Sequence, residues 1–555
     1  MAREGKIISL QFAPDVRTRV REDLTALLRG LGWSCGLQIS PGLNMAGNTV
    51  GQILVRMQHS IRDCKEALLD DGPDRGNQFS LFLSPGGDAP KTIEFSTDAF
   101  IPRLLRGRRL RCGDRLPKDS LTRQGVVLAT ASERPVWVTI GDQGARRDVV
   151  LQGEDWYAEE DRVFEHLKGD RLFRCVPILE WLRHVANWDK WRKPPTMACI
   201  MFDDPNLHST RYGFISFGEL LQAAKSENFS VALATVPLDG WYVNKKAVRL
   251  IGESNGRLSL LLHGLHHSRK ELSRNGETLL PLRAPRALRR IQRIEEKYGL
   301  KFSRVMAPPH GAFSIGSMGC LASLGIEAAC VTWGSICSSN RDDAWTRLLG
   351  AHPGLLISGL GILPRFRLAE GIENQLLLSA YLNQPLIPVG HHWDVAGGLD
   401  LLKEVASFVN GLGDVVWCDT GNMARKNYLV KENGKALHVR PLSRVVDLHV
   451  EDDGLEEVIV ELENWPYCDD DSGLEVAIRQ GSRRLKCEKN SSHEWVFWQP
   501  RKGDYTIEIK PQVEGVVDPS KAKIPFSHLA RRIASEARDR VMPFLPRRLW
   551  KRWAR

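Results

Sequence analysis

Clusters of ionisable side chains follow short apolar runs in the middle of the sequence. Asp203 and Asp204 come directly after the run Met197 to Phe202, and His263 and His267 follow the run Leu258 to Leu262. Two imidazoles and one carboxylate can hold a divalent cation while leaving a coordination position open for water. Such a cation lowers the pKa of water to about 7 and polarises a carbonyl, so the cluster indicates metal-assisted hydrolysis.

Each cluster also has an ordinary structural explanation. Adjacent aspartates usually cap or hydrate a turn, and a buried imidazole usually bonds to a backbone group. If the chain from His263 to His267 forms a helical turn, the two imidazoles lie on the same side and can face one cation. Three histidines within five residues at the end of a strand favour the metal interpretation.

Two further segments complete the set of candidate residues. His391, His392 and Trp393 follow the apolar run Leu386 to Val389, and an imidazole there could act as a general acid. The segment Pro308-Pro309-His310-Gly311 predicts a rigid wall after another strand, with His310 able to contact a substrate. All four segments would lie at the carboxyl ends of strands, where α/β proteins build their sites.

The elements that must position these residues are alternating strands and helices. Short continuous apolar runs separated by helical stretches are typical of buried parallel strands with covering helices. We expect strands at Met197 to Phe202, Val231 to Val236, Leu258 to Leu262, Arg304 to Pro308, Ala328 to Trp333, Leu386 to Val389 and Val415 to Cys418. This alternation suits a barrel or an open doubly wound sheet, and periodicity alone does not choose between them.

The flanking segments predict three further parts. Residues 1–192 mix strand and helix patterns and form an N-terminal α+β domain whose role the sequence does not reveal, ending at Lys193-Pro194-Pro195. Residues 193–430 hold the β/α repeats. Alternating runs over 431–518 predict a small antiparallel β-sandwich. Within it, Trp495 and Trp498 could stack on sugar rings or belong to the core. Residues 519–555 form a basic amphipathic tail.

Taken in order, these motifs resemble the polysaccharide deacetylases of carbohydrate esterase family four, with their chitooligosaccharide-deacetylase homology domain. The resemblance covers about residues 196 to 420, and its strongest matches are Phe202-Asp203-Asp204 and His263 with His267. It implies a distorted (β/α) barrel and a divalent metal, commonly Zn²⁺.

The resemblance also implies a role for each matched residue. Asp204, His263 and His267 would hold the metal, and Asp203 would be the general base that takes a proton from the water on the metal. His391, or His392 in its place, would protonate the leaving amine, while Pro309, His310 and Trp393 would contact the substrate.

The sequence departs from the family pattern at the wall motif, where Ala307 stands in place of an arginine that braces the base. Three outcomes stay open: another residue supplies the brace, the substrate differs, or activity is lost. We therefore expect a metal-dependent hydrolase that removes an acyl group, acetyl above all, from a sugar or glycan. The alternative is a non-catalytic glycan-binding or polysaccharide-assembly protein that keeps the same domain.

Composition and charge limit the partners and the compartment. The 555 residues carry a net charge of +10, and Arg531 to Arg555 hold nine basic residues against Glu536 and Asp539, so +7 of that charge belongs to the tail. The remaining +3 is too little to argue for a nucleic-acid-binding body. The resemblance implies a carbohydrate substrate, and the basic tail would suit a lipid-linked glycan. Eleven scattered cysteines and an N-terminus without a long apolar run predict a cytoplasmic protein, with the tail as a candidate contact to a membrane surface.

Overall fold

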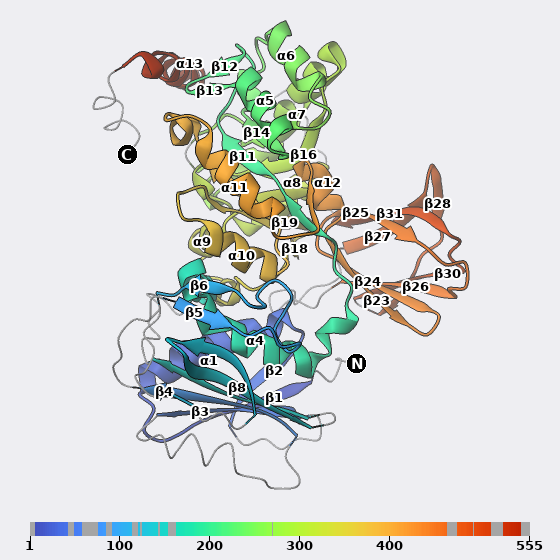
Figure 1. Ribbon diagram of the computed structural model, residues 1–555. Helices are drawn as coiled ribbons and strands as arrows, with labels where there is room; N and C mark the ends of the chain where they lie inside the picture. Colours follow the sequence, from blue (N-terminus) through green and yellow to red (C-terminus); the bar gives the residue numbers. More distant parts are fainter. Residues whose placement is uncertain are drawn as a thin grey trace. The chain divides into compact units, whose positions relative to one another are not determined.

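The structure is a computed structural model, and the chain has a mixed α/β fold that divides into two compact units (Figure 1). The structure describes residues 6–42, 49–57, 76–84, 92–113, 120–121, 125–142, 145–153, 162–268, 270–462, 474–491, 493–511 and 526–545. One unit comprises residues 1–190, 344–352 and 373–382, and the other comprises residues 191–343, 353–372 and 383–555. Two short segments from the middle of the sequence thus pack within the N-terminal unit.

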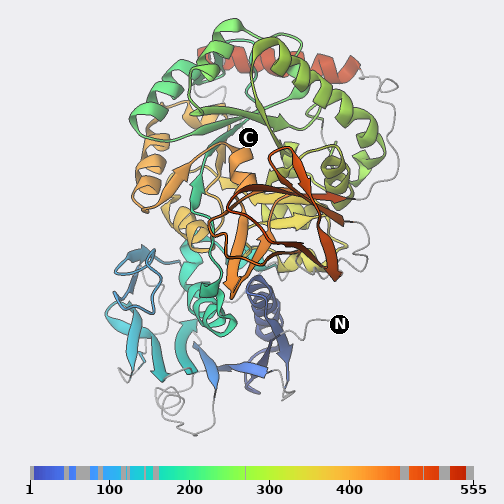
Figure 2. The same cartoon turned by 90° about the vertical axis from the view of Figure 1, so that its right-hand side faces the viewer.

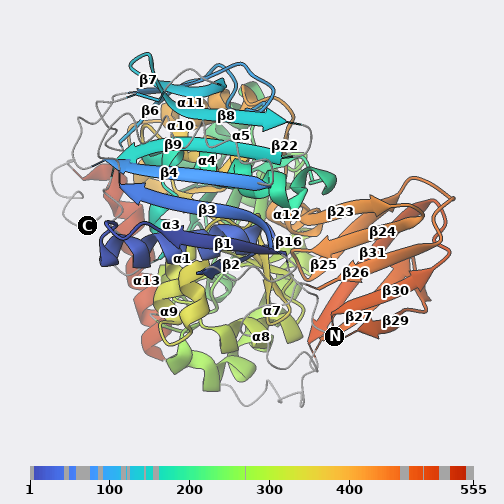
Figure 3. The ribbon, with the colours of Figure 1, turned by 90° about the horizontal axis from the view of Figure 1, so that it is seen from below.

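The N-terminal unit is built on one nine-stranded sheet, whose strands lie side by side in Figure 3. Its strand order is β2-β1-β3-β4-β9-β8-β7-β5-β6, parallel from β2 to β9 and antiparallel beyond. Its elements are β1 (Ile7–Phe12), α1 (Thr18–Ser34), β2 (Gln38–Pro41), β3 (Thr49–Met57), β4 (Asn77–Ser84), β5 (Thr92–Phe95), β6 (Arg109–Arg111), β7 (Val126–Ala131), β8 (Arg134–Asp142), β9 (Ala145–Gly153), α3 (Val163–His166), α4 (Leu172–Ala186) and α10 (Glu373–Tyr381).

The second unit contains the predicted β/α repeats as a second nine-stranded sheet, with helices lying around it (Figure 2). The elements of this part are β10 (Thr196–Ala198), β11 (Ile200–Asp203), β12 (Arg211–Tyr212), β13 (Ile215–Ser216), α5 (Phe217–Ser226), β14 (Val231–Thr235), α6 (Lys245–Gly252), β15 (Leu258–His263), α7 (Leu280–Tyr298), β16 (Phe302–Ala307), α8 (Ile315–Ser323), β17 (Ala328–Val331), α9 (Trp333–Ser339), β18 (Leu355–Ile357), β19 (Leu360–Pro364), β20 (Phe366–Arg367), β21 (Pro388–Gly390), α11 (Asp400–Asn410), β22 (Val415–Trp417) and α12 (Thr420–Arg425).

The predicted closed barrel is not confirmed. The strand order β18-β19-β17-β16-β15-β14-β11-β21-β20 has two edges, and the described residues form no ladder between β18 and β20. The last strand on one side, β18, runs antiparallel to β19, while all other pairs are parallel. Buried residues from most of these strands nevertheless meet in one cluster that includes Met201, Ala234, Leu261 and Cys330, so the sheet is curled around a common core.

The segment predicted as a sandwich forms two sheets, of five and four strands, visible in Figure 3. One pair, β24 with β26, is parallel, because the connection between them passes through the other sheet, so this part is not wholly antiparallel. Buried residues of both sheets form a single hydrophobic cluster, which includes Val439, Val460, Ile478 and Ile507. The strands are β23 (Tyr428–Asn433), β24 (Ala436–Pro441), β25 (Val445–Val450), β26 (Glu457–Glu461), β27 (Leu474–Gln480), β28 (Arg483–Leu485), β29 (Glu488–Ser491), β30 (Glu494–Trp498) and β31 (Gly503–Pro511).

The basic tail contains one long helix, α13 (Phe526–Val541), which belongs to the second unit. It is followed by a short 3-10 turn at Met542–Phe544, where Pro543 ends the α-helical hydrogen bonding. The other tail residues, 519–525 and 546–555, lie outside the described part of the chain. Among the described helices none is both long and apolar enough to cross a bilayer.

Candidate metal centre

The candidate site residues lie where parallel strands of the second unit end. Strand β11 ends at Asp203 and β15 ends at His263, with only β14 between them in the sheet. His391 follows the last residue of β21, which pairs with β11 on its other side. Because the carboxyl ends of parallel strands share one edge of a sheet, these side chains are brought together there.

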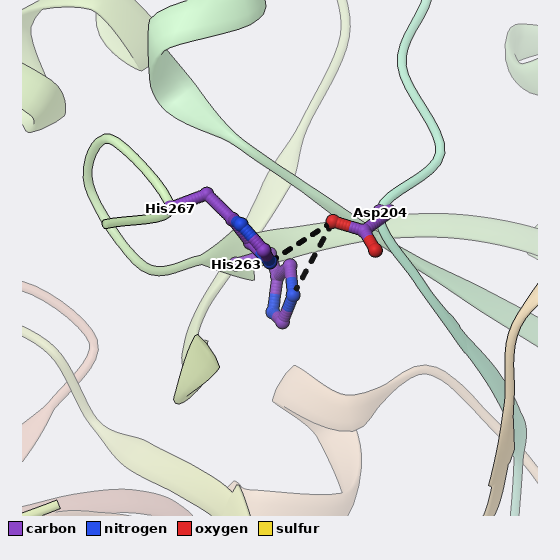
Figure 4. A group of neighbouring side chains, drawn as sticks. All are labelled: Asp204, His263 and His267. Atoms are coloured by element: carbon purple, nitrogen blue, oxygen red, sulfur yellow. Dashed lines mark ion pairs between the residues drawn. The ribbon is translucent and has the colours of Figure 1, made fainter. Parts of the chain in front are cut away.

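Three of the predicted residues face a common point (Figure 4). The possible ligand atoms of Asp204, His263 and His267 all lie within 4.8 Å of one another. Asp204 Oδ1 is 3.1 Å from His267 Nε2 and 3.7 Å from His263 Nε2. These separations are of the size found between ligands of one cation.

The protonation and bonding of these residues suit a cation. The Nδ1 atom of His263 lies 2.9 Å from the carbonyl oxygen of Ala307. Donation of the Nδ1 proton to that oxygen leaves Nε2 free to bind a cation. Burial lowers the pKa of His267 to about 3 despite the nearby Asp204, so its imidazole is neutral at pH 7. The buried Oδ1 of Asp204 has no hydrogen-bond partner within the described chain, although it faces both imidazoles. This donor set therefore fits a divalent cation.

The turn that carries His267 is not helical. Gly264 and His267 have φ of 63° and 53°, in the left-handed region, so the chain after β15 forms an irregular loop. The buried Glu271 carboxylate holds this loop by accepting the backbone N–H groups of Leu265, His266 and His267 at 2.9, 3.0 and 3.1 Å. The two imidazoles thus meet, with ring centres 4.9 Å apart, for a reason other than helical spacing.

Asp203, the predicted base, is held by an arginine that the sequence does not reveal. Arg365 Nη1 donates to Asp203 Oδ1 at 2.9 Å, and both side chains are buried. Burial by itself would raise the pKa of Asp203, but Arg365, His263 and His391 together lower it below its ordinary value. Asp203 is therefore an ionised carboxylate, and Arg365 occupies the bracing role for which Ala307 is unsuited.

Helix α13 lies against the same site, beside β12 and β13 in Figure 1. Arg532 of this helix pairs with Asp239 through two hydrogen bonds, and its Nη1 is 3.6 Å from Asp204 Oδ1. Arg532, Asp203 and His263 are all buried with α13 in this position. The C-terminal helix therefore forms part of the wall around the candidate metal position.

Two more polar contacts fix α13. Tyr212 donates its hydroxyl proton to Asp539 at 2.7 Å, and His208 Nδ1 lies 2.7 Å from Glu536 Oε1. Burial opposes charge on His208, but hydrogen bonds to Glu536 and to the backbone of Asp239 raise its pKa above the ordinary value. The polar side chains of Arg532, Glu536 and Asp539 thus point inward, which the basic composition of the tail does not predict.

The two late histidines occupy different surroundings. The His391 ring stacks on Trp393, with ring centres 4.5 Å apart, and His391 is near enough to Asp203 and Asp204 to lower the pKa of both. His392 is buried against Tyr212 and Phe214, and its Nε2 is 3.6 Å from Asp539 Oδ1. His391 therefore faces the acidic pair, whereas His392 faces the C-terminal helix.

The wall motif lies beside the metal candidates. His310 has a φ of 55° and its ring centre is 4.9 Å from that of His267. Pro309 is buried next to Gly264, where any Cβ would come within 2.3 Å of the proline ring. The predicted substrate residues Pro309, His310 and Trp393 thus border the site, which does not by itself assign them a role.

The residues missed by sequence reasoning share one property, since each comes from a segment far from the motifs. Arg365 and Arg532 are separated from Asp203 and Asp204 by more than 150 residues, and neither lies in a recognisable pattern. Glu271 is the exception, because an acidic residue four positions after His267 could have been tested as an anchor for the loop.

Comparisons with known proteins give partial likenesses in structure only. No family model matches the chain, and no curated protein matches it. A protein from Mycobacterium smegmatis ascribed to the polysaccharide deacetylases is 14% identical, at a TM-score of 0.31, over 42% of this chain and 90% of its own. The chain is also similar to a family 4 carbohydrate esterase from Streptomyces lividans, at 13% identity and a TM-score of 0.25, over 41% of this chain and 93% of that one. A family 4 esterase from Streptococcus mutans is 12% identical at a TM-score of 0.25, over 40% of this chain and 85% of its own. The functional conclusion below therefore rests on the site geometry and its motifs.

Proposed function

We propose that this chain is a metal-dependent hydrolase that removes an acyl group, acetyl above all, from the nitrogen or oxygen of a sugar. The observation that carries the proposal is the meeting of Asp204, His263 and His267 at one point, with an ionised Asp203 beside them. A divalent cation held there, Zn²⁺ by its preference for this donor set, would supply a Lewis acid and lower the pKa of water.

The chain's own residues would supply the proton transfers. Asp203 is a buried carboxylate fixed by Arg365, so it is suited to accept a proton from water in the site. His391 stands near both aspartates and is our candidate for the general acid that returns a proton to the leaving amine. His392 lies too close to the C-terminal helix to be our first choice for that role.

The identity of the substrate follows from the motifs rather than from the geometry. The resemblance to deacetylase motifs supports a glycan with an acyl substituent, and the near-balanced charge outside the tail supports an uncharged partner over nucleic acid. We place the reaction in a reducing compartment such as the cytoplasm, because the cysteines are scattered and the described ones are free.

Acetate release tests this proposal directly. Purified protein is expected to release acetate from N-acetylated or O-acetylated oligosaccharides, because the site can activate water. A chelator should abolish the release and added Zn²⁺ should restore it. Heat-treated protein serves as the control. Metal-loaded protein that releases no acetate from either substrate class would contradict the hydrolase function.

Arg365 offers a prediction about pH. Replacing it by Ala removes a cation that lowers the pKa of Asp203, so that pKa should rise. Because the base works only as a carboxylate, the acidic limb of the kcat/KM profile should move to higher pH. Arg365→Lys keeps the charge and is the matched control, with a smaller shift. An unchanged acidic limb in Arg365→Ala would show that Asp203 is not the titrating base.

A second candidate function, glycan binding without turnover, has one specific observation in its favour. The C-terminal sheets carry a groove of about 930 Å³ that is lined in part by Trp498. Trp498 is 58% exposed, whereas Trp495 is 5% exposed and belongs to the core. Its charged lining balances, with Asp453, Glu456 and Glu488 against Arg483, Lys486 and Arg501. A polar, neutral groove with an exposed aromatic face suits an uncharged sugar.

Trp498→Ala tests this groove. Loss of the stacking face is expected to weaken binding of a neutral oligosaccharide by about tenfold, from the magnitude of aromatic contacts. Titration calorimetry on the full chain measures the effect, and Val416→Ala is a control at an exposed apolar residue elsewhere in the same unit. Equal affinities in the wild type and Trp498→Ala would exclude the groove as a sugar site.

A further inference from the structure

Helix α13 is oriented opposite to an ordinary amphipathic surface helix. Its inward side carries the ionisable residues Arg532, Glu536 and Asp539, at a spacing of four and three residues. Its outward side carries the apolar stripe Phe526, Ala530, Ile533, Ala537 and Val541, at spacings of three and four residues. A helix normally buries its apolar side, so this arrangement leaves the apolar side for another partner.

The stripe is exposed to a degree that is unusual for such residues. Phe526 is 81% exposed, Ile533 53% and Val541 52%, and Phe544 just beyond the helix is 86% exposed. These are four of the large apolar side chains that the described structure leaves most open to solvent, and they come from a segment of fewer than twenty residues. A contiguous apolar surface of this kind marks an interaction site.

The inward contacts prevent the helix from rotating to hide the stripe. Arg532 is paired with Asp239, Asp539 accepts from Tyr212, and Glu536 lies against His208. Rotation would leave the buried Asp239 without its cation, and an uncompensated charge in a buried position is strongly unfavourable. The orientation is therefore enforced by buried polar contacts beside the candidate site.

Basic residues border the stripe on both sides. At 100° per residue, Arg531 and Arg538 project along one edge of the exposed surface and Arg540 along the other. Arg531 and Arg540 are exposed, and the sequence from Arg531 onward contains nine basic residues and two acidic ones. An apolar stripe between cations matches the boundary between the acyl chains and the anionic headgroups of a bilayer.

We infer that the outward side of α13 docks on an anionic membrane surface. Because the inward side of the same helix contacts Asp204 through Arg532, docking would hold the candidate metal centre next to the bilayer. Resting on the proposed function, this points to a sugar carried by a lipid as the substrate class. The membrane contact itself does not depend on any catalytic activity.

Vesicle flotation of the full chain tests the docking. Wild-type protein should float with vesicles of phosphatidylcholine containing phosphatidylglycerol and remain behind with phosphatidylcholine alone. The double variant Phe526→Ser/Ile533→Ser removes apolar area from exposed positions, so it should fold normally and bind about tenfold or more weakly. Arg531→Gln should weaken binding about fivefold, the effect of one cation near an anionic surface. Val416→Ser is the matched control, an exposed apolar residue on β22, and should bind as the wild type.

Three results would overturn the docking: wild-type protein that does not float with anionic vesicles, a double variant that floats equally well, or a double variant that turns a wild-type dimer into a monomer. The last would make the stripe a contact between copies of the chain. Acetate release from a water-soluble acetylated oligosaccharide separates the two proposals. It should persist in the double variant, whereas Asp203→Asn should lose it and still float.

Discussion

Asp203→Asn is expected to lower kcat for acyl hydrolysis by about 10²- to 10⁴-fold, the range that general acid–base catalysis contributes. The amide keeps the shape of the carboxylate and can still accept the hydrogen bond from Arg365 through its oxygen. It cannot take a proton from water at neutral pH. Steady-state acetate release by both proteins, at matched metal content, measures the effect.

The control for this variant is the metal itself. Asp203 is not among the three residues whose ligand atoms converge, so Asp203→Asn should bind as much Zn²⁺ as the wild type. Full activity in the variant would contradict the role of Asp203 as base. Loss of activity together with loss of metal would instead assign Asp203 to the ligand set.

Asp204→Ala or His263→Ala is expected to weaken Zn²⁺ binding by about a hundredfold or more, since even residues behind the ligands contribute 10- to 100-fold in known sites. Each removes one of the three donors that converge in the part of the chain that the structure describes. Binding to the folded state also stabilises it, by about 2.7 kcal/mol at a hundred times the dissociation constant. Added Zn²⁺ should therefore raise the Tm of the wild type and leave that of either variant nearly unchanged.

His266→Gln is the matched control for these variants. His266 lies in the same loop, and burial, with nearby arginines, lowers its pKa to about 4, so it is a neutral imidazole like His267. It is outside the converging group and should keep both the affinity and the Tm shift. Equal loss in His266→Gln would mean that the loop, rather than a defined ligand set, determines metal binding.

The sequence could predict those residues of the site that lie at the ends of strands. Asp203, His263 and His391 each follow a continuous apolar run, and parallel strands bring such positions to one edge whatever their spacing in sequence. The mechanism of convergence was different for His267, where a left-handed loop anchored by Glu271 replaces the expected helical turn. The sequence shows an acidic residue four positions after His267, but it does not show that this carboxylate accepts the backbone N–H groups of the loop.

The contribution of Arg365 could not be predicted because it depends on how the whole sheet curls. Arg365 lies between β19 and β20, and only the curvature brings that connection to Asp203. Arg532 was missed for a different reason, because its basic, amphipathic segment suggested an exposed tail. Alternating strands and helices could not decide between a closed and an open sheet either. The strand order of the described residues, with β18 and β20 at its edges, shows no closed barrel.

The central claim is that Asp204, His263 and His267 hold one cation. X-ray diffraction at the zinc absorption edge, from crystals of protein purified without chelator, tests it most directly. We expect a single anomalous peak about 2.0–2.2 Å from Asp204 Oδ1 and the Nε2 atoms of both histidines. No peak at that position in Zn²⁺-soaked crystals, with Arg532 filling the space beside Asp204, would contradict the claim.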